Sequence, residues 1–418
     1  MERAQLKSLV LATGCTEQRG EFVFLRDPKW GPAEQSRLAA AVQTPGVACG
    51  DQLGWLCVPT GGTSGGLRFA RHDERTLGAA VRSFCAHFGV SRVNALDVLP
   101  AYHVSGLLAR IRCAETGGTH LGWSWKQLEA GEWPAMPESD HGWFLSLVPT
   151  QLQRLLTSNA AIARLKQFRA VFLGGGPLWP ALADAAAAAQ VPVSICFGMT
   201  ETAAMVAAQR PGEFLAGDRS CGTIMPHVRV DLLDEVSGEI LPLLSTGRVR
   251  ISGESGFRGY WPEANDHQSL LTEDLGQIDA QGRLYLLGRR DAVIITGGEK
   301  VSPLEVEAVL RATDEFDDIA VIGLPDARWG DVVVACYPPR AAKLDTQKIM
   351  AALETLAPYK RPKLYLTISP WPRNDQGKLN RAALAKAAAG DSSGLPSGSR
   401  VGRIILNPPV GPESEAAD

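Results

Sequence analysis

The chain has 418 residues, of which 45% are hydrophobic and 21% charged, a composition typical of soluble globular enzymes. This length exceeds one ordinary core and suits two domains. The net charge of -3 argues against a general nucleic-acid or membrane-surface binder. No apolar run is long enough to span a bilayer. The eight cysteines are scattered without a CxxC pair, so we expect reduced thiols, no zinc site and a cytoplasmic location.

The first glycine-rich segment, PTGGTSGGLRFAR (59–71), has the composition of a loop that wraps around phosphate. Its small residues let backbone N–H groups converge on an anion, and its hydroxyls add donors. It lacks the Lys-Ser or Lys-Thr pair that closes a P-loop. Because glycine also marks ordinary loops, the segment alone leaves both interpretations open.

Three apolar, strand-like runs that end in loops come next: NALDVLPAYHVSG (94–106), FRAVFLGGGPL (168–178) and VPVSICFGMTE (191–201). Helical patterns follow the first two, and this repetition is typical of a doubly wound α/β sheet. Ligands of such sheets bind beyond the carboxyl ends of the strands. The sequence therefore predicts an α/β domain with its ligand site at these loops.

The pattern changes in the second half of the chain. Short β segments joined by glycine turns between 217 and 290 predict a small β-rich subdomain. Beyond it, strands and helices alternate on a smaller scale, with a helix starting at Pro303 after the N-cap Ser302. We expect a large N-terminal domain of doubly wound sheets plus the β-subdomain (1–290), a small α+β domain (291–389) and a flexible Gly-, Ser- and Pro-rich tail (390–418).

Seven segments together resemble the motifs of adenylate-forming enzymes, the acyl-CoA synthetase or AMP-binding superfamily, in the order of that family. In the nucleotide-binding part they are TGGTSGGLR (60–68), PAYHVSG (100–106), GGGP (174–177), FGMTE (197–201) and TEDLG (272–276). The hinge and the catalytic-lysine segment are GRRDAVIITGGEKVSPLEVE (288–307) and PRNDQGKLNR (372–381). A chance match of so many ordered motifs is very improbable, so the chain is identified as a member of this superfamily.

The resemblance implies an enzyme that joins an acid to ATP and then to coenzyme A, with Mg²⁺ as cofactor. Joining a carboxylate to ATP builds negative charge at the α-phosphorus, so such a site needs preorganised donors and cations. The implied catalytic residues are Lys378 and Thr200 at the α-phosphate and Glu201, whose hard oxygen suits magnesium. The implied ATP- and AMP-binding residues are Thr60, Gly61, Gly62, Thr63, Ser64, Gly65, Arg68, Gly174, Gly175, Gly176, Phe197, Gly198, Met199, Asp274 and Arg289.

The resemblance also implies an acyl pocket and a moving small domain. The pocket residues are His103, Ser105, Gly106 and Arg112. We expect His103 to be a gate or pocket wall, because a carboxylate nucleophile needs no general base; a purely structural histidine is the alternative. The small domain is expected to rotate about Asp291, which withdraws Lys378 and presents Gly297, Gly298 and Lys300 to coenzyme A.

Within the superfamily, LPAYHVSG, LGGGPL, FGMTETAAM and TGGEKVSP look most like the o-succinylbenzoate–CoA ligases of menaquinone and phylloquinone biosynthesis. That small-molecule acid has an aromatic body and a second carboxylate, so its pocket should hold a spare cation. Arg110 and Arg112 are the candidates, with Arg112 preferred, although both also suit a solvated helix face. The alternatives are another aryl or acyl acid–CoA ligase, a stand-alone adenylating enzyme or, from another class, an inactive nucleotide-binding module.

Four departures from the family pattern stand out. The phosphate loop begins near residue 60, where the family has a longer segment ahead of it, so part of the usual N-terminal subdomain and of a possible homodimer surface is expected to be missing. Glu273 replaces a glycine and should point away from the ribose. Phe197 replaces the commoner tyrosine and can still stack on adenine, and Arg68 stands where lysine is more usual.

Overall fold

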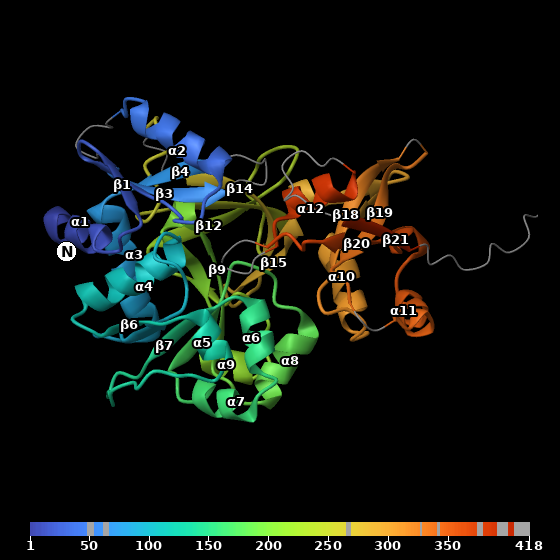
Figure 1. The fold of residues 1–418 in the computed structure, drawn as a ribbon, viewed down its shortest axis with the longest axis horizontal. Helices are drawn as coiled ribbons and strands as arrows, with labels where there is room; N and C mark the ends of the chain where they lie inside the picture. The colour runs from blue at the N-terminus through green and yellow to red at the C-terminus, as the bar shows by residue number, and fades with distance from the viewer. Residues whose placement is uncertain are drawn as a thin grey trace, which may run out of the picture. The chain divides into compact units, whose positions relative to one another are not determined.

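The computed structural model describes residues 1–47, 54–61, 67–264, 269–326, 328–340, 343–373, 379–390 and 400–404. They form two compact units. The first consists mainly of residues 1–178 and 182–287, and the second begins at Gly288. Both combine helices with sheets (Figure 1), so the predicted α/β class is confirmed. The domain limits at 290 and 389 stay predictions.

The largest sheet of the first unit has the strand order β11-β10-β9-β8-β7-β5-β6. The parallel strands are β5 (Ala95–Asp97), β6 (His120–Gly122), β7 (Phe144–Leu147), β8 (Ala170–Leu173) and β9 (Val193–Met199). The antiparallel strands at one edge are β10 (Ala204–Ala208) and β11 (Thr223–Ile224). Helices lie on both sides of this sheet, as predicted, so the loops that carry the site emerge at its carboxyl edge.

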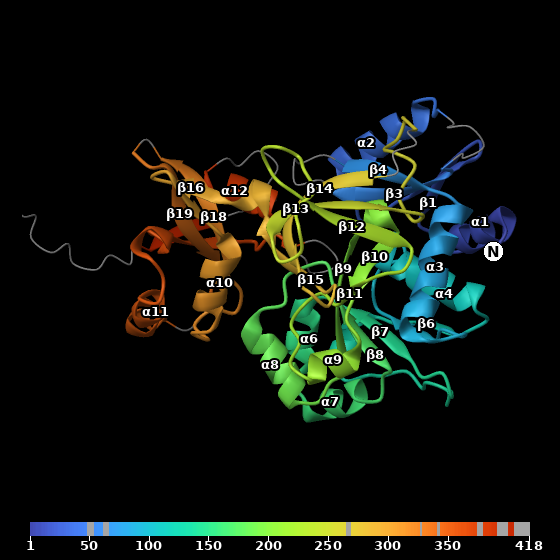
Figure 2. The same ribbon diagram turned by 180° about the vertical axis from the view of Figure 1, so that it is seen from behind.

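Figures 1 and 2 show α3 and α4 on one side of the sheet and α6, α7 and α8 on the other. The bounds are α3 (Glu74–Phe88), α4 (Val104–Glu115), α6 (Pro149–Leu155), α7 (Asn159–Leu165) and α8 (Pro180–Ala188), with the short helices α5 (Trp125–Glu129) and α9 (Pro211–Leu215). Aromatic packing fixes α3: the Phe84 ring meets Phe144 edge-on at 5.3 Å, and Phe144 stacks on Phe172 at 5.5 Å. Such pairs stabilise beyond the area they bury.

Two smaller sheets complete the first unit, together with α1 (Arg3–Leu11) and α2 (Pro32–Gln43). In one of them the strands lie side by side in chain order: β1 (Thr16–Arg19), β2 (Phe22–Leu25), β3 (Leu56–Gly61) and β4 (Leu67–His72). The other, which accounts for the predicted β-rich subdomain, consists of β12 (Val228–Leu233), β13 (Thr246–Gly253), β14 (Ser269–Ile278) and β15 (Leu284–Arg289). Thr60 and Arg68 face each other across the antiparallel β3–β4 pair.

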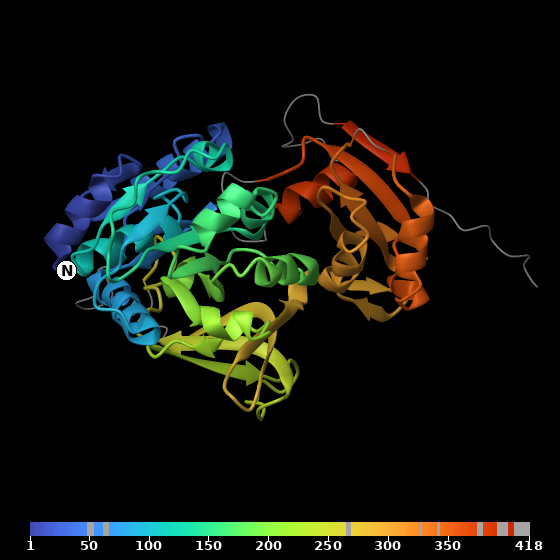
Figure 3. The same cartoon turned by 90° about the horizontal axis from the view of Figure 1, so that it is seen from below.

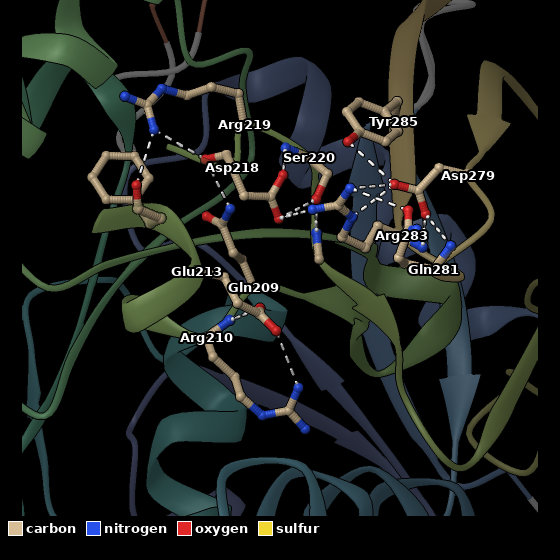
Figure 4. Close-up of polar contacts among 12 residues, drawn as sticks. Gln209, Arg210, Glu213, Asp218, Arg219, Ser220, Asp279, Gln281, Arg283 and Tyr285 are labelled. Carbon is tan, nitrogen blue, oxygen red and sulfur yellow. Dashed lines mark hydrogen bonds and ion pairs between the residues drawn. The ribbon is translucent and has the colours of Figure 1, made fainter. Parts of the chain in front are cut away.

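A polar network ties the β14–β15 hairpin to the segment after α9 (Figure 4). Arg283 Nε donates to Asp279 Oδ2 at 2.7 Å, and the Arg283 guanidinium lies 3.7 Å from Asp218 Oδ2. Asp218 in turn accepts from the backbone N–H of Ser220 at 2.9 Å. Burial disfavours the charged form of Asp218, but these hydrogen bonds and the arginine hold its pKa below the ordinary value. The network fixes the strand that carries Asp274.

The second unit, drawn in orange to red in Figure 3, has one sheet with helices around it. Its strand order is β17-β16-β19-β20-β21, and β18 pairs with β19. The strands are β16 (Ile294–Thr296), β17 (Glu299–Val301), β18 (Ala320–Asp326), β19 (Gly330–Tyr337), β20 (Leu364–Ser369) and β21 (Arg400–Ile404). The helices are α10 (Pro303–Arg311), α11 (Thr346–Leu353) and α12 (Arg381–Ala388), with single 3₁₀ turns at Arg290–Ala292 and Pro358–Lys360.

Two sequence expectations can be compared directly with the second unit. α10 begins at Pro303 after the N-cap Ser302, as predicted, although the Ser302 side chain makes no capping hydrogen bond. Within the tail predicted to be flexible, residues 400–404 form β21, which pairs antiparallel with β20. The edge strand β20 offers this segment backbone hydrogen-bond partners, and the flexibility of the tail stays a prediction.

The longest helix among the described residues, α3, has 15 residues. None of the helices in this part of the chain is both long and apolar enough to cross a membrane. The seven cysteines in the described ranges are free thiols.

A sharp reversal after β9 forms the turn on which the site is built. Ala203 and Ala204 have φ values of 50° and 80°, a left-handed backbone conformation that is uncommon for residues other than glycine. The returning strand β10 approaches β9 so closely that a Cβ on Gly198 would lie 1.6 Å from the carbonyl oxygen of Ala204. Only glycine fits at this position.

We therefore expect Gly198→Ala to destabilise the first unit. The added methyl group must push two hydrogen-bonded strands apart, and we expect the free energy of unfolding to fall by about 3 kcal/mol or more, the upper end for overpacking. Gly212→Ala in α9 is the matched control, since a Cβ there meets nothing within 4 Å. Urea unfolding of both variants is the measurement; equal stabilities would contradict the close approach.

Candidate active site

Glu201 lies in the 3₁₀ turn Thr200–Thr202 that follows β9, and its side chain is only 7% exposed. Two hydroxyl groups donate to the same carboxylate oxygen, Oε1: Tyr260 at 2.7 Å and Thr60 at 3.1 Å. Among the described residues none donates to Oε2. The carboxylate is thus held in one orientation with one oxygen left for another ligand.

The turn itself is fixed by backbone contacts from distant parts of the chain. The Thr202 hydroxyl accepts from the N–H of Met199 at 3.1 Å and closes the turn. The N–H of Phe257 donates to the carbonyl of Glu201 at 2.9 Å. His72, at the end of β4, contacts the carbonyl of Thr200 through Nε2 at 2.8 Å. Thr200 and Glu201 therefore occupy a rigid position at the carboxyl end of β9.

His72 is fully buried, and burial lowers its pKa from 6.5 to about 4, although the carbonyl of Thr200 and the charges of Asp73 and Glu201 act in the opposite direction. The ring is therefore neutral at pH 7. The hydrogen-bond pattern assigns its tautomer: Nε2–H donates to Thr200, and Nδ1 accepts from the Thr76 hydroxyl at 3.1 Å. A neutral imidazole here serves as a fixed donor.

Arg68 provides a cation beside this carboxylate. Its guanidinium carbon lies 4.1 Å from the centre of the Tyr260 ring, a cation–π contact. The side chain is otherwise exposed, so its N–H groups remain available. Of the predicted phosphate-loop residues, Gly62, Thr63, Ser64 and Gly65 lie outside the described residues, whereas Thr60, Gly61 and Arg68 lie on β3 and β4.

Tyr260 is the functional candidate that sequence reasoning missed. Burial raises its pKa, and the negative charge of Glu201 raises it further, so the phenol stays protonated and remains a donor. Its backbone forms an antiparallel bridge with Ala70 of β4, and the flanking Trp261 donates to Phe69 at 2.9 Å. Because the contact spans distant segments, the local pattern around residue 260 carries no signal for it.

The predicted adenine side is built from the loop after β8 and the end of β9. A Cβ on Gly174 would lie 3.1 Å from the Sγ of Cys196, and Gly175 has a left-handed φ of 75°. Gly176 follows in the same loop, and Met199 is half-buried. Phe197 is 8% exposed and belongs to the apolar cluster that joins β9 to β13, so little of its ring faces outward.

The predicted acyl-pocket residues lie along α4. His103 is the N-cap residue of the helix, without a capping side-chain bond, and its ring packs on Tyr102 at 4.7 Å. Ser105 is half-buried. A Cβ on Gly106 would lie 2.5 Å from the carbonyl oxygen of Pro100, so glycine lets the helix start directly against this loop. Arg112 lies further along the helix, about 13 Å from His103 at 1.5 Å per residue.

Arg112 is a buried cation. It is 4% exposed, its guanidinium carbon lies 4.2 Å above the Phe84 ring, and its Nε has no hydrogen-bond partner among the described residues. Burial lowers its pKa to about 10. A cavity of about 10 Å³ lies beside it, lined by Phe84, Phe144, Phe172 and Ser146 among others. No carboxylate of the described residues forms an ion pair with it, which is unusual for a buried charge.

His227 is a second polar side chain, and it lies within the electrostatic influence of Arg112. Both of its ring nitrogens are buried without a partner among the described residues. Burial, together with the positive charges of Arg112 and Arg82, lowers its pKa to about 4. A neutral imidazole and an unpaired guanidinium therefore lie close enough to interact, and together they form an environment that suits an anion.

The predicted ribose residue Asp274 lies on β14, where its N–H donates to the Thr272 hydroxyl at 3.1 Å. The neighbouring Glu273 pairs with Arg248 at 2.5 Å. The pairing of β13 with β14 is irregular between Leu271 and Leu275, so strand alternation does not fix the direction of Glu273, and the expectation that it points away from the ribose stays a prediction.

In the second unit, Arg289 forms a two-pronged ion pair with the predicted hinge residue, Nε to Asp291 Oδ1 at 2.8 Å and Nη2 to Asp291 Oδ2 at 2.7 Å. Sequence reasoning gave these residues separate roles and did not foresee the pair. Gly297 and Gly298 both have left-handed φ values, 58° and 83°, and Lys300 is exposed on β17.

Lys378 lies outside the described residues. The chain on either side of its segment is well anchored: Arg373 and Leu379 form an antiparallel bridge. The buried carboxylate of Asp318 accepts from Trp371 Nε1 at 2.6 Å and pairs with Arg373.

The oxygen ligands at Glu201 fit a magnesium ion that arrives with a nucleotide. Mg²⁺ is usually bound by one or two carboxylates together with water and substrate phosphates. Oε2 of Glu201 offers one such ligand. The described ranges contain no group of three or more His, Cys, Asp or Glu side chains that could hold a metal by themselves.

Comparisons with known families match this arrangement. The model of the AMP-binding enzymes matches residues 32–261, and that of the AMP-binding enzyme C-terminal domain matches residues 305–378. The 2-succinylbenzoate–CoA ligase of Geobacillus kaustophilus is 32% identical over 300 residues, which cover 70% of this chain and 60% of the relative. A long-chain-fatty-acid–CoA ligase of Mycobacterium tuberculosis is 30% identical, covering 84% of this chain and 71% of that enzyme.

A solved structure of a related enzyme has a similar fold. The o-succinylbenzoate coenzyme A synthetase from Bacillus subtilis, in complex with ATP and magnesium ion, superposes with a TM-score of 0.66 at 25% identity and covers 78% of this chain and 68% of that one. The chain thus spans 60% of the length of the Geobacillus ligase and 68% of the Bacillus synthetase.

The neutral His72 predicts a pH dependence of stability. Its pKa of about 4 in the folded protein lies below the ordinary 6.5, so the unfolded chain binds more protons in this window. The free energy of unfolding should therefore fall as the pH decreases from 6.5 towards 4, by up to about 1.4 kcal/mol per pH unit for one proton. In His72→Gln, which keeps a donor for Thr200 but does not titrate, this slope should be shallower by that amount.

The measurement is urea unfolding at several pH values. His141→Gln, in the loop before β7, is the control and should keep the wild-type slope. An unchanged slope in His72→Gln would contradict a neutral, buried His72. Glutamine also keeps the contact with Thr200, so the comparison isolates titration.

Proposed function

The chain belongs to the AMP-binding enzyme family, and we propose that it is an ATP-dependent acid–CoA ligase that forms an acyl-adenylate and then a CoA thioester. The observation that carries the proposal is the carboxylate of Glu201, whose Oε1 is tied by Thr60 and Tyr260 while Oε2 accepts no hydrogen bond from the described residues. Next to it, Arg68 provides a cation held on the Tyr260 ring. A metal ligand and a phosphate-binding cation are the two elements that Mg·ATP needs.

In the first half-reaction the acid carboxylate attacks the α-phosphorus of ATP, and pyrophosphate leaves. Arg68 and the hydroxyl of Thr60 suit the β- and γ-phosphates, since both lie at the ends of β3 and β4. Thr200, in the fixed turn, and Lys378 are assigned to the α-phosphate. Glu201 would hold the magnesium ion, which would supply positive charge where negative charge develops. Because these groups are fixed before reaction, they need no reorganisation in the transition state.

In the second half-reaction the CoA thiol attacks the acyl carbonyl of the adenylate, the thioester forms, and AMP leaves. We assign the hinge to Asp291 and the CoA side to Gly297, Gly298 and Lys300. The Arg289–Asp291 ion pair, at 2.7 Å with side chains about a third exposed, supports a hinge role, because breaking a solvent-accessible pair costs little. Arg289 then has two alternative partners, Asp291 and the nucleotide ribose.

For the acid we propose o-succinylbenzoate, so that the enzyme belongs to menaquinone or phylloquinone biosynthesis. The support is the unpaired, buried guanidinium of Arg112, which lies beside an aromatic-lined cavity and within electrostatic reach of His227. The second carboxylate of this acid would neutralise Arg112, and its ring suits Phe84, Phe144 and Phe172. The cavity of about 10 Å³ holds about one water, so the substrate must displace side chains as it enters.

The test of the activity is ATP–pyrophosphate exchange with a panel of acids. Exchange with o-succinylbenzoate, followed by thioester formation with CoA, is the expected result. Exchange with only an aliphatic or another aryl acid would replace the substrate proposal, and exchange without thioester formation would indicate a stand-alone adenylating enzyme. If no acid supports exchange, the chain is an inactive nucleotide-binding module.

The Arg112 assignment predicts a selective loss. Arg112→Met keeps the aliphatic stem and removes the charge, so it should raise the KM for o-succinylbenzoate by roughly 10- to 150-fold, as expected from about 1.5–3 kcal/mol for a hydrogen bond to a charged group. The monocarboxylic 3-benzoylpropionate lacks the second charge, and its KM should change little.

Arg110→Met, on the same helix, tests the other candidate: Arg110 is half-buried, and its Nε also has no hydrogen-bond partner among the described residues. If Arg112 binds the second carboxylate, Arg110→Met should not alter the preference between the two acids. Steady-state exchange kinetics of both variants with both acids give the comparison. Equal losses for the dicarboxylate and the monocarboxylate in Arg112→Met would show that Arg112 only supports the fold.

The role of Lys378 predicts a separation of the half-reactions. Lys378→Ala should slow adenylate formation by roughly 10²–10³, the effect of removing one preorganised electrostatic group. Thioester formation from supplied acyl-AMP should persist, because that step needs no charge at the triphosphate. Single-turnover kinetics of each step is the measurement, and similar losses in both steps would refute the assignment.

A further inference from the structure

Tyr260 connects two charged groups of the site that come from different parts of the chain. Its hydroxyl donates to Glu201 Oε1 at 2.7 Å, and the face of its ring carries the Arg68 guanidinium at 4.1 Å. The tyrosine itself is held in place by the bridge to Ala70 on β4. One side chain therefore contacts both the metal carboxylate and the phosphate-side cation.

We propose that Tyr260 is a positioning residue that sets the magnesium requirement of ATP binding by orienting the carboxylate of Glu201. The inference rests on the proposed function and adds a residue to it. The hydroxyl acts through Glu201, and the aromatic ring acts separately through Arg68. These two roles can be removed one at a time.

The hydrogen-bond geometry explains how the orientation arises. Each carboxylate oxygen has about two lone-pair sites, and Tyr260 and Thr60 occupy both on Oε1. Oε2 is thereby left as the oxygen available to a cation. Without the tyrosine hydroxyl, the carboxylate keeps one donor and can rotate, so it loses part of its affinity for the metal.

The ring has a different effect. A cation–π contact holds the guanidinium without using its N–H donors, so the donors of Arg68 remain available to an anionic ligand. An ion pair with Glu201 would instead use those donors and neutralise the metal ligand. The tyrosine thus keeps Arg68 close to Glu201 without letting the two groups cancel each other.

Two substitutions separate these effects. Tyr260→Phe keeps the ring for Arg68 and removes the hydroxyl, whereas Tyr260→Leu removes both. Tyr285→Phe is the matched control. The Tyr285 hydroxyl also contacts a carboxylate, that of Asp279 at 3.4 Å, but this pair belongs to the network of the β14–β15 hairpin (Figure 4). ATP binding is followed by calorimetry across a titration of free Mg²⁺. AMP is the control ligand, because it lacks the β- and γ-phosphates that would share the metal with Glu201.

We expect Tyr260→Phe to need a free Mg²⁺ concentration at least about tenfold above that of wild type for half-maximal ATP binding, the scale of one hydrogen bond to a charged group. Its affinity for AMP should be unchanged. Tyr260→Leu should in addition weaken ATP binding a few-fold at saturating Mg²⁺, as expected for a lost cation–π contact. Tyr285→Phe should behave as wild type.

An unchanged Mg²⁺ requirement in Tyr260→Phe overturns the inference, and so does an equal loss of AMP affinity, which would indicate a purely structural role. If wild type binds ATP with no dependence on Mg²⁺, both the inference and the proposed function fail. If wild type shows the dependence and Tyr260→Phe does not shift it, only the inference fails.

Discussion

The close approach of β9 and β10 is the constraint on which the rest of the site depends. Because Gly198 has no side chain, the returning strand can pass against β9, and the chain must turn sharply at Thr200–Thr202. That turn is too short to move, so Thr200 and Glu201 have one position relative to the sheet. Donors from β3, β4 and the segment around residue 260 can then be preorganised around a carboxylate that does not move.

The parts of the molecule that could be read from the sequence are those with a local cause. Glycines at 106, 175 and 198 mark close contacts or left-handed backbone, and the strand–loop–helix order predicted the doubly wound sheet. His72 and Tyr260 could not be found in this way, because their roles come from contacts with residues 128 and 59 positions away. The burial of Phe197 and the Arg289–Asp291 pair likewise depend on neighbours that only the fold supplies.

In the proposed complex Arg68 faces the triphosphate and Arg112 faces the acid, and the two arginines differ in their exposure to solvent. Arg68 is exposed and held by a ring face, so it can meet a triphosphate with little desolvation. Arg112 is 4% exposed, and burial lowers its pKa to about 10. Its charge has lost hydration and gained the Phe84 ring but no carboxylate among the described residues. A site of this second kind discriminates strongly, because a neutral ligand leaves the buried charge unpaired.

The bridge between Ala70 and Tyr260 has a consequence for the order of events on the ribosome. The nascent chain presents Glu201 well before residue 260 has been made, and domains form from the N-terminal end as synthesis proceeds. Until the segment around Tyr260 emerges and pairs with β4, the carboxylate lacks one of its two hydroxyl donors. The set of hydrogen bonds that orients Glu201 is therefore complete only after most of the first unit has been translated.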